Sequence, residues 1–134
     1  MQPAHTCDLF FTLLAAAGIQ LPADQPPDGL NLSPLIKDSQ SKITRDTMYW
    51  HYPHYYETTT PVSAIRAGDW KLLEYFEDER RELFNLRDDP TESRDLAKSQ
   101  PAKVVELSKQ LTAWWSDVGA KMPSPNPQFR AKGK

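Results

Sequence analysis

Cysteine, net charge and long apolar runs are all scarce in this chain of 134 residues, and each shortage excludes a class of protein. The single cysteine, Cys7, rules out an internal disulfide framework. No stretch approaches the roughly 20 apolar residues that a membrane-spanning helix needs. A formal net charge of −2 gives no electrostatic reason to expect binding to nucleic acid or to an anionic membrane surface.

Targeting signals and repeats are also missing. The first residues carry no basic run and Asp8 interrupts the apolar stretch that follows, so we expect no signal peptide within this sequence. No internal repeat is visible. The hydrophobic fraction of 39% and the charged fraction of 25% are typical of a soluble globular protein. Most of the twelve prolines lie in Pro22–Pro34 and Pro123–Pro127, so the compact part should be smaller than the length indicates.

Apolar residues at helical spacing predict a first helix from about Cys7 to Ala17. We expect Thr6 as its N-cap and Gly18 in the left-handed conformation just after its end. One wide face of this helix is apolar, and no earlier residue can cover it. Residues 20–45 then predict a long irregular connection that contains one helical turn capped by Ser33.

The middle of the chain predicts a small antiparallel sheet, because its segments are rich in aromatic and β-branched residues. The predicted strands are Thr47–Tyr52, Val62–Arg66, Trp70–Phe76 and Glu82–Leu86. Gly68 allows a tight hairpin between the second strand and the third, since glycine adopts positive φ without steric cost. After Pro101, apolar residues at three- and four-residue steps predict a helix over about 102–118, with a tryptophan-containing stripe that lies on the sheet.

Histidines and tyrosines gather at the end of the first predicted strand. His51 and His54 have a spacing found in some zinc sites, but such pairs normally share one helical face, and Pro53 favours a strand and a turn. Two interpretations stay open. Either one histidine packs in the sheet while the other faces solvent, or the imidazoles act with Tyr52, Tyr55 and Tyr56 on a polyhydroxylated anionic ligand such as a sulfated sugar.

Arg66 is a candidate cation for such a ligand, because its planar guanidinium matches a sulfate or a carboxylate. The alternative, which we favour, is a surface ion pair with Asp69 or Glu74. The tryptophans of the third strand and the last helix are expected in the core. No Ser/His/Asp or Cys/His arrangement and no glycine-rich phosphate loop is present.

The order of the motifs resembles the C-terminal part of sulfatases, from about Asp8 to Phe129. The motifs, in order, are Asp8-Leu9-Phe10, Asp28-Gly29-Leu30-Asn31-Leu32-Ser33-Pro34-Leu35, His51-Tyr52-Pro53-His54-Tyr55, Ser63-Ala64-Ile65-Arg66, Gly68-Asp69-Trp70-Lys71-Leu72, Glu82-Leu83-Phe84-Asn85-Leu86 and Asp89-Pro90-Thr91-Glu92. Each motif alone is weak, but their order and spacing extend over most of the chain. The likeness is greatest to bacterial sulfatases of the arylsulfatase A type, many of which act on sulfated glycans.

The resemblance implies an α+β fold, in which a small antiparallel sheet of about four strands is packed by one long C-terminal helix. A helix and an irregular crossover from an α/β domain outside this sequence precede the sheet. We therefore divide the chain into residues 1–45, the terminal helix and crossover, residues 46–122, the α+β subdomain, and residues 123–134, an extended tail.

Sulfatases break sulfate esters with a formylglycine, made from Cys or Ser in a Cys/Ser-x-Pro-x-Arg motif, and with calcium. Cys7 lacks the proline and the arginine of that motif, and Pro90 makes Asp88-Asp89 a turn rather than the acidic pair that holds calcium. The resemblance thus implies no catalytic and no metal-binding residue in this chain. It places formylglycine and calcium in the N-terminal domain of a parent enzyme that is periplasmic or secreted.

Two functions remain as hypotheses. In the first, the chain is a sulfatase fragment, inactive alone, that supports a wall of the substrate cleft with His51, His54, Tyr52, Tyr55 and Arg66. Its partners are then the N-terminal domain, a sulfated glycan or sulfate ester, and a second copy through the exposed apolar helix. In the second, the chain is a stand-alone, non-catalytic binding module for sulfated or acidic glycans. A plain structural domain with no site is a third interpretation.

Overall fold

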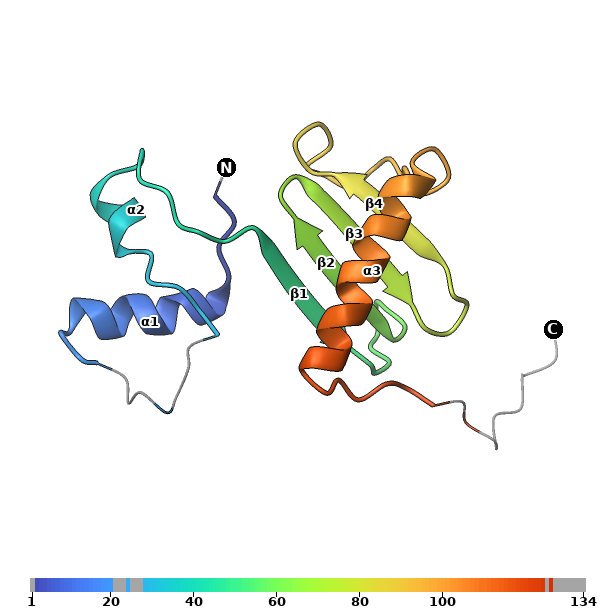
Figure 1. The fold of residues 1–134 in the computed structure, drawn as a ribbon, viewed down its shortest axis with the longest axis horizontal. Coiled ribbons are helices and arrows are strands. Elements are labelled where there is room, and N and C mark those ends of the chain that lie inside the picture. Colours follow the sequence, from blue (N-terminus) through green and yellow to red (C-terminus); the bar gives the residue numbers. More distant parts are fainter. Residues whose placement is uncertain (1, 21–23, 25–27, 125, 127–134) are drawn as a thin grey trace. The chain divides into compact units, whose positions relative to one another are not determined.

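The computed structural model describes residues 2–20, 24, 28–124 and 126 (Figure 1). The chain divides into two compact units, Met1–Arg45 and Asp46–Lys134. Most of the tail predicted over residues 123–134 lies outside the described residues, as do 21–23 and 25–27 of the predicted connection. No helix in the described ranges is both long enough and apolar enough to cross a membrane.

The first unit begins with helix α1, Thr6–Ala16. The prediction of Thr6 as the N-cap is wrong, because His5 takes that position. The His5 side chain accepts the Cys7 backbone N–H, and the Asp8 carboxylate accepts the His5 N–H at 2.6 Å, so two free N–H groups of the helix start are satisfied together. Gly18 has φ +69° just after the helix, as predicted.

Helix α2, Ser33–Lys37, is the predicted helical turn, with one correction. Ser33 is its first residue rather than its cap, since Leu32 occupies the N-cap and the Asn31 side chain accepts the Ser33 N–H at 2.9 Å. The segment before α2 lies against α1. Gly29 is required there, because a Cβ at this position would lie 2.5 Å from the carbonyl oxygen of Cys7.

Helix α1 buries polar residues and exposes apolar ones, the reverse of the usual arrangement. Asp8 is fully buried, and its two carboxylate oxygens each accept a hydrogen bond from the Arg45 guanidinium at 2.6 Å. These bonds hold the pKa of the Asp8 carboxyl far below its usual range. The exposed fractions of Leu9, Phe10 and Leu13 are 56%, 56% and 68%. The predicted exposed apolar face of this helix is therefore present.

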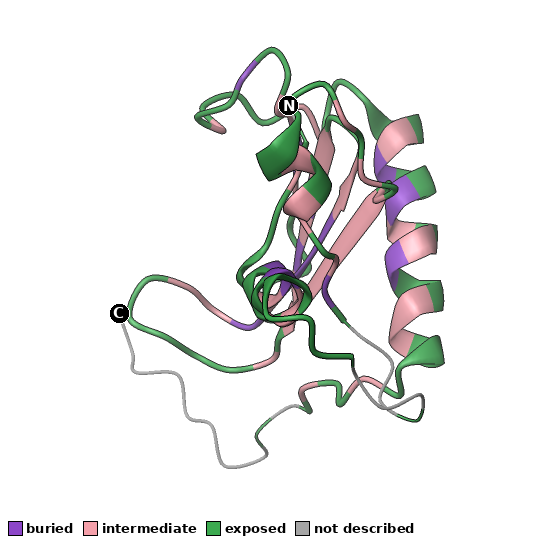
Figure 2. Cartoon of the chain, turned by 90° about the vertical axis from the view of Figure 1, so that its left-hand side faces the viewer, coloured by how far each residue is buried: buried purple, intermediate pink, exposed green. Residues whose placement is uncertain are grey.

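The second unit is an antiparallel sheet with one helix on it, as predicted. Its strands are β1 (Thr47–Tyr52), β2 (Val62–Ala67), β3 (Trp70–Tyr75) and β4 (Arg81–Asn85), paired in the order β1-β2-β3-β4. Helix α3, Pro101–Asp117, lies on one face. Its buried residues point toward the sheet (Figure 2). The core consists of Ile65, Leu72, Leu83, Val104, Leu107 and Leu111.

Candidate functional site

Aromatic side chains are exposed at the end of the sheet where β1 finishes. Tyr52 is the last residue of β1 and is 43% exposed, while Tyr55 and Tyr56 in the following loop are 69% and 62% exposed. The exposed His54 ring packs edge-on against Tyr52, with 5.6 Å between ring centroids. We call these four residues the tyrosine cluster. Two backbone hydrogen bonds between Tyr56 and Thr59, of 3.0 and 3.3 Å, close the loop on itself.

His51 points to the other face of the sheet, because successive strand residues alternate between the two faces. Its Nε2 lies 2.8 Å from the Lys121 carbonyl oxygen, which can only accept, so Nε2 carries the proton. Nδ1 then accepts the Ser63 hydroxyl at 2.6 Å, and the Trp115 indole N–H donates to the same hydroxyl at 3.2 Å. Both ring nitrogens of His51 are therefore engaged within the unit.

The close pair of Ser63 and His51 is not a candidate nucleophile and base. Ser63 has no exposed surface, so no substrate can reach its hydroxyl. The pair instead ties the sheet to helix α3 through Trp115, and to the segment after α3 through Lys121. No pattern in the sequence indicates this network, because one of its members is a backbone carbonyl.

Arg66 does not join the tyrosine cluster. The strand register places Arg66 opposite Met48, which is four residues before Tyr52 on β1. At about 3.3 Å per residue the two ends are roughly 13 Å apart along the strand. Within the described residues Arg66 forms no ion pair with Asp69 or Glu74, so the favoured alternative is wrong. Glu74 cannot serve because it faces α3, where it pairs with Arg81.

The acidic pair Asp88-Asp89 stabilises a turn. The Asp89 carboxylate accepts hydrogen bonds from Thr91, Ser93 and Arg94. These bonds lower the pKa of Asp89 to about 2. In the described part of the chain, no group of three or more His, Cys, Asp or Glu side chains comes together as a metal site. The Asp88-Asp89 turn, in which the Asp89 oxygens accept these bonds, does not fit the calcium of a sulfatase.

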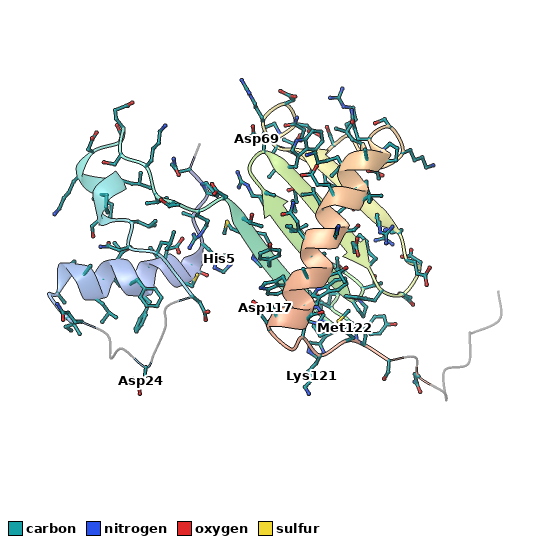
Figure 3. All side chains as sticks on the ribbon, in the orientation of Figure 1. His5, Asp24, Asp69, Asp117, Lys121 and Met122 are labelled. Carbon is teal, nitrogen blue, oxygen red and sulfur yellow. The ribbon has the colours of Figure 1, made fainter. Side chains whose placement is uncertain are left out.

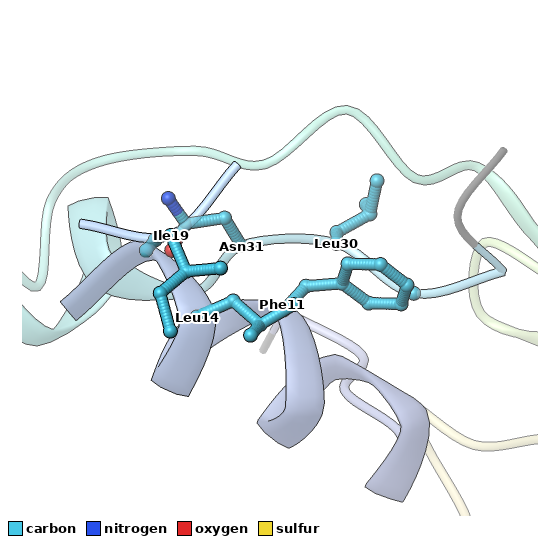
Figure 4. A pocket seen from close by; sticks show the side chains of 7 residues that line it. Phe11, Leu14, Ile19, Leu30 and Asn31 are labelled. Atoms are coloured by element: carbon cyan, nitrogen blue, oxygen red, sulfur yellow. The ribbon is translucent and has the colours of Figure 1, made fainter. Parts of the chain in front are cut away.

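In the first unit, Cys7 is not in a formylglycine motif, and the hollow that its described residues form is mainly apolar. The Cys7 sulfur lies in α1, 3.3 Å from the His5 ring nitrogen. A hollow of about 280 Å³ lies between α1 and the segment before α2 (Figure 4). It is lined by Phe11, Leu14, Ala15, Ile19, Gly29, Leu30 and Asn31. This lining is almost entirely apolar, which does not suit a sulfated ligand.

Comparison with known proteins connects these two units to one family. Residues 3–117 match the family described as N-sulphoglucosamine sulphohydrolase, C-terminal. A sulfatase from Formosa agariphila is 30% identical over an alignment 148 residues long, which covers 92% of this chain and 27% of that protein. A Delta 4,5-hexuronate-2-O-sulfatase from Bacteroides thetaiotaomicron is 34% identical over 95 residues, which cover 69% of this chain and 19% of that protein.

Solved structures agree with the sequence relatives. A 2-O GAG sulfatase superposes with a TM-score of 0.68 at 26% identity, covering 90% of this chain and 27% of that structure. A protein solved with its substrate, D-glucosamine-2-N,6-O-disulfate, shares the fold with a TM-score of 0.61 at 23% identity, covering 84% of this chain and 24% of that structure. This chain thus spans about a quarter or less of the relatives it matches. With helices α1 to α3 and the whole sheet inside the matched range, the chain belongs to the sulfatase family, in its C-terminal domain.

Proposed function

We propose that this chain is the C-terminal module of a sulfatase that acts on a sulfated glycan, where it forms one wall of the substrate cleft and is inactive alone. The observation that supports this most is the tyrosine cluster, exposed at one end of a well-packed sheet in a chain of this family. Side chains that follow directly from a packed strand are held in place, which a binding wall requires.

The chemistry of the cluster suits a sugar. Tyrosine rings stack on the C–H faces of a pyranose, while phenol hydroxyls and the His54 imidazole exchange hydrogen bonds with its hydroxyls. Tyr52, Tyr55 and Tyr56 present such rings to solvent. The names of the relatives, a hexuronate-2-O-sulfatase and a 2-O GAG sulfatase, favour an acidic, sulfated glycan as the ligand.

The groups that break the ester would lie on another part of the sulfatase. In that family formylglycine supplies the nucleophile and calcium stabilises the developing negative charge. In this proposal residues 1–45 are the last helix and crossover of the α/β domain. The exposed Leu9, Phe10 and Leu13 then pack against that domain, in a parent enzyme that is periplasmic or secreted. Without that domain, the same face would pair with a second copy of this chain.

The test is a titration of the purified chain, followed by NMR, with a 2-O-sulfated hexuronate disaccharide. We expect saturable binding that the double substitution Tyr55→Ala/Tyr56→Ala weakens, because the stacking surface is removed. Phe10→Ala is the control, since it removes another exposed aromatic ring, 56% exposed, from the first unit. Equal binding by all three proteins would exclude the tyrosine cluster as the site.

Activity and affinity separate this proposal from the alternative of a stand-alone glycan-binding module. The chain alone should not turn over an aryl sulfate at any calcium concentration, and saturable turnover would refute the claim that it is inactive alone. A cleft wall supplies only part of a ligand's contacts, so we expect weak affinity, with a Kd of about 1 mM. Micromolar or tighter binding by the chain alone would favour the stand-alone module.

A further inference from the structure

The tyrosine cluster begins a row of side chains that crosses the whole sheet at one end. The strand register pairs Tyr52 of β1 with Val62 of β2, and Val62 with Tyr75, the last residue of β3. The Tyr75 N–H donates to the Arg80 carbonyl at 3.0 Å, so Arg80 continues the row just before β4. Residues directly opposite one another in an antiparallel sheet point to the same face. The row therefore lies on one face of the sheet, from the tyrosine cluster to Arg80.

This face is the one opposite helix α3. Glu74, the residue before Tyr75, is hydrogen-bonded to that helix. Because strand residues alternate between the two faces, Tyr75 points away from the helix, as Tyr52 does. In Figure 3 the Asp69 hairpin marks one end of the second unit, and Lys121, whose carbonyl bonds to the end of β1, marks the other end, where the row lies.

The guanidinium of Arg80 forms a flat surface at the end of this row. It lies over the Tyr75 ring, with 3.6 Å from Cζ to the ring centroid, so its other face points outward. Two carboxylates hold it in place, since Nη1 donates to Asp78 at 2.9 Å and Nε donates to Glu82 at 3.2 Å. The Tyr75 hydroxyl donates to the same Glu82 carboxylate at 3.2 Å. The Arg80 side chain is 46% exposed, and its Nη2 takes no part in these bonds.

The charges around Arg80 indicate which part of a glycan suits it. Asp78 and Glu82 neutralise the guanidinium, while Glu77 and Glu79 of the same turn are exposed. The turn as a whole is therefore acidic and repels a sulfate or a carboxylate. An uncharged sugar meets no such repulsion. Its C–H face can pack on the flat guanidinium while its hydroxyls accept hydrogen bonds from Nη2.

We propose that Arg80 binds an uncharged sugar residue of the glycan whose sulfated residue lies at the tyrosine cluster, and that Tyr75 is the positioning residue that keeps the guanidinium flat. This inference rests on the proposed function, because it extends the same site along the sheet. Three strand spacings of about 4.8 Å each, roughly 14 Å in all, separate Tyr52 from Arg80. One sugar residue is too short to cover that distance, so binding should strengthen with the length of the glycan.

The experiment compares three ligands by NMR titration of the purified chain. The first is the 2-O-sulfated hexuronate disaccharide. The other two are tetrasaccharides that add two uncharged sugar residues to it, one at its reducing end and one at its non-reducing end. We expect one of the tetrasaccharides to bind about two- to fivefold more tightly than the disaccharide, the effect of one or two exposed hydrogen bonds. Because the added contact involves no net charge on the sugar, salt should leave this gain unchanged.

The substitution Arg80→Lys tests the guanidinium. Lysine keeps the charge but not the planar group, so this variant should lose the gain from the longer ligand while it binds the disaccharide as before. Arg87→Lys is the matched control, because it makes the same change at an exposed arginine beyond the other end of β4. An equal loss in Arg87→Lys would contradict a contact at Arg80.

Two substitutions of Tyr75 test its positioning role. Tyr75→Phe keeps a ring under the guanidinium, whereas Tyr75→Leu removes the ring. We expect the phenylalanine variant to keep more of the gain than the leucine variant. This difference should disappear when Arg80→Lys is also present, which a general loss of stability would not produce. A difference that persists would overturn the positioning role.

A sulfate on the added sugar residues tests the charge argument. The acidic turn should repel that group, so this ligand should bind more weakly than its uncharged counterpart, and salt should reduce the difference. Tighter binding of the sulfated extension would contradict the assignment of an uncharged sugar to Arg80.

The remaining outcomes separate this inference from the proposed function. Equal binding of the disaccharide and both tetrasaccharides would refute the contact at Arg80 and leave the tyrosine cluster as the site. A gain that Arg80→Lys retains would assign the added sugars to another surface and refute the contact as well. No binding of any ligand by the unmodified chain would refute the proposed function, and this inference with it.

Discussion

Asp8→Asn should open the first unit, because the Asp8 side chain joins the start of α1, the segment before α2 and Arg45. The Asp8 carboxylate accepts hydrogen bonds from the backbone N–H groups of His5 and Leu30. It also accepts one from each of the two terminal nitrogens of the Arg45 guanidinium. Asparagine keeps one acceptor oxygen and leaves Arg45, whose side chain is 9% exposed, without a counter-charge. Removing one partner of a buried ion pair costs about 3–5 kcal/mol. A unit of this size has a total stability of only about 2–7 kcal/mol.

Amide hydrogen exchange measures this opening directly. Leu32 is the probe, because Thr12 rather than Asp8 accepts its N–H, at 2.9 Å. A loss of about 3 kcal/mol would speed its exchange roughly 100-fold. Asp38→Asn is the control, since it alters an exposed carboxylate that accepts the Gln40 N–H. Exchange at Leu32 within threefold of the unmodified chain would refute the reasoning.

Acid should reproduce the effect of that substitution. The pKa of Asp8 is depressed in the folded unit, so its contribution to stability is complete above the unfolded-state pKa of about 3.9. The contribution is lost as the pH falls below that value. Exchange at Leu32 should therefore accelerate in acid, relative to the intrinsic rate, more steeply than it does in Asp8→Asn.

Three further substitutions test the second unit by urea unfolding. Leu107→Ala should cost about 2–5 kcal/mol, because the side chain is 1% exposed, whereas Val105→Ala on the outer face should stay within about 0.5 kcal/mol. Thr60→Val should stabilise the unit by about 1 kcal/mol, because the Thr60 hydroxyl is buried without a partner in the described structure. Its control, Thr59→Val, should not stabilise the unit, because it loses a hydrogen bond to the Thr60 carbonyl. The folded-state pKa of Asp89 is about 2, so its contribution to stability is lost as the pH falls from about 4 toward about 2. Asp89→Asn should remove that part of the loss of stability in acid. An unchanged dependence of stability on pH would contradict this prediction.

The fold could be predicted from sequence where buried residues recur at the regular spacing of a helix or a strand. Val104, Leu107 and Leu111 repeat at three- and four-residue steps, and all three are buried against the sheet. The two residues of the hairpin, Gly68 and Asp69, set the pairing of β2 with β3. Local patterns of this kind are enough to predict the type and position of these elements.

The parts that could not be predicted depend on contacts between distant residues. Asp8 has the position of a residue that stabilises a helix dipole, yet its main partner is Arg45, which is 37 residues away. His5 was not expected as an N-cap, because histidine is seldom the acceptor at that position. No local pattern joins these residues before the chain has folded.

The candidate site shows the same division. The alternation of a strand places His51 and Tyr52 on opposite faces, and this could be read from sequence alone. The distance of Arg66 from Tyr52 could not, because it requires the register between β1 and β2. The contact of Lys121 with His51 could not be predicted from sequence, because the backbone oxygen of Lys121 rather than its side chain accepts the hydrogen bond.

The bond from His51 to Lys121 also determines where this unit can be shortened. A version that stopped at Asp117 would keep every core residue of α3 but would remove the Lys121 carbonyl, which accepts the hydrogen bond from the imidazole. The histidine could then rotate or change tautomer, and the alignment of Ser63 with Trp115 would be lost with it. Trimmed versions for crystallisation or engineering should therefore extend past Lys121, even though the last helix has already ended.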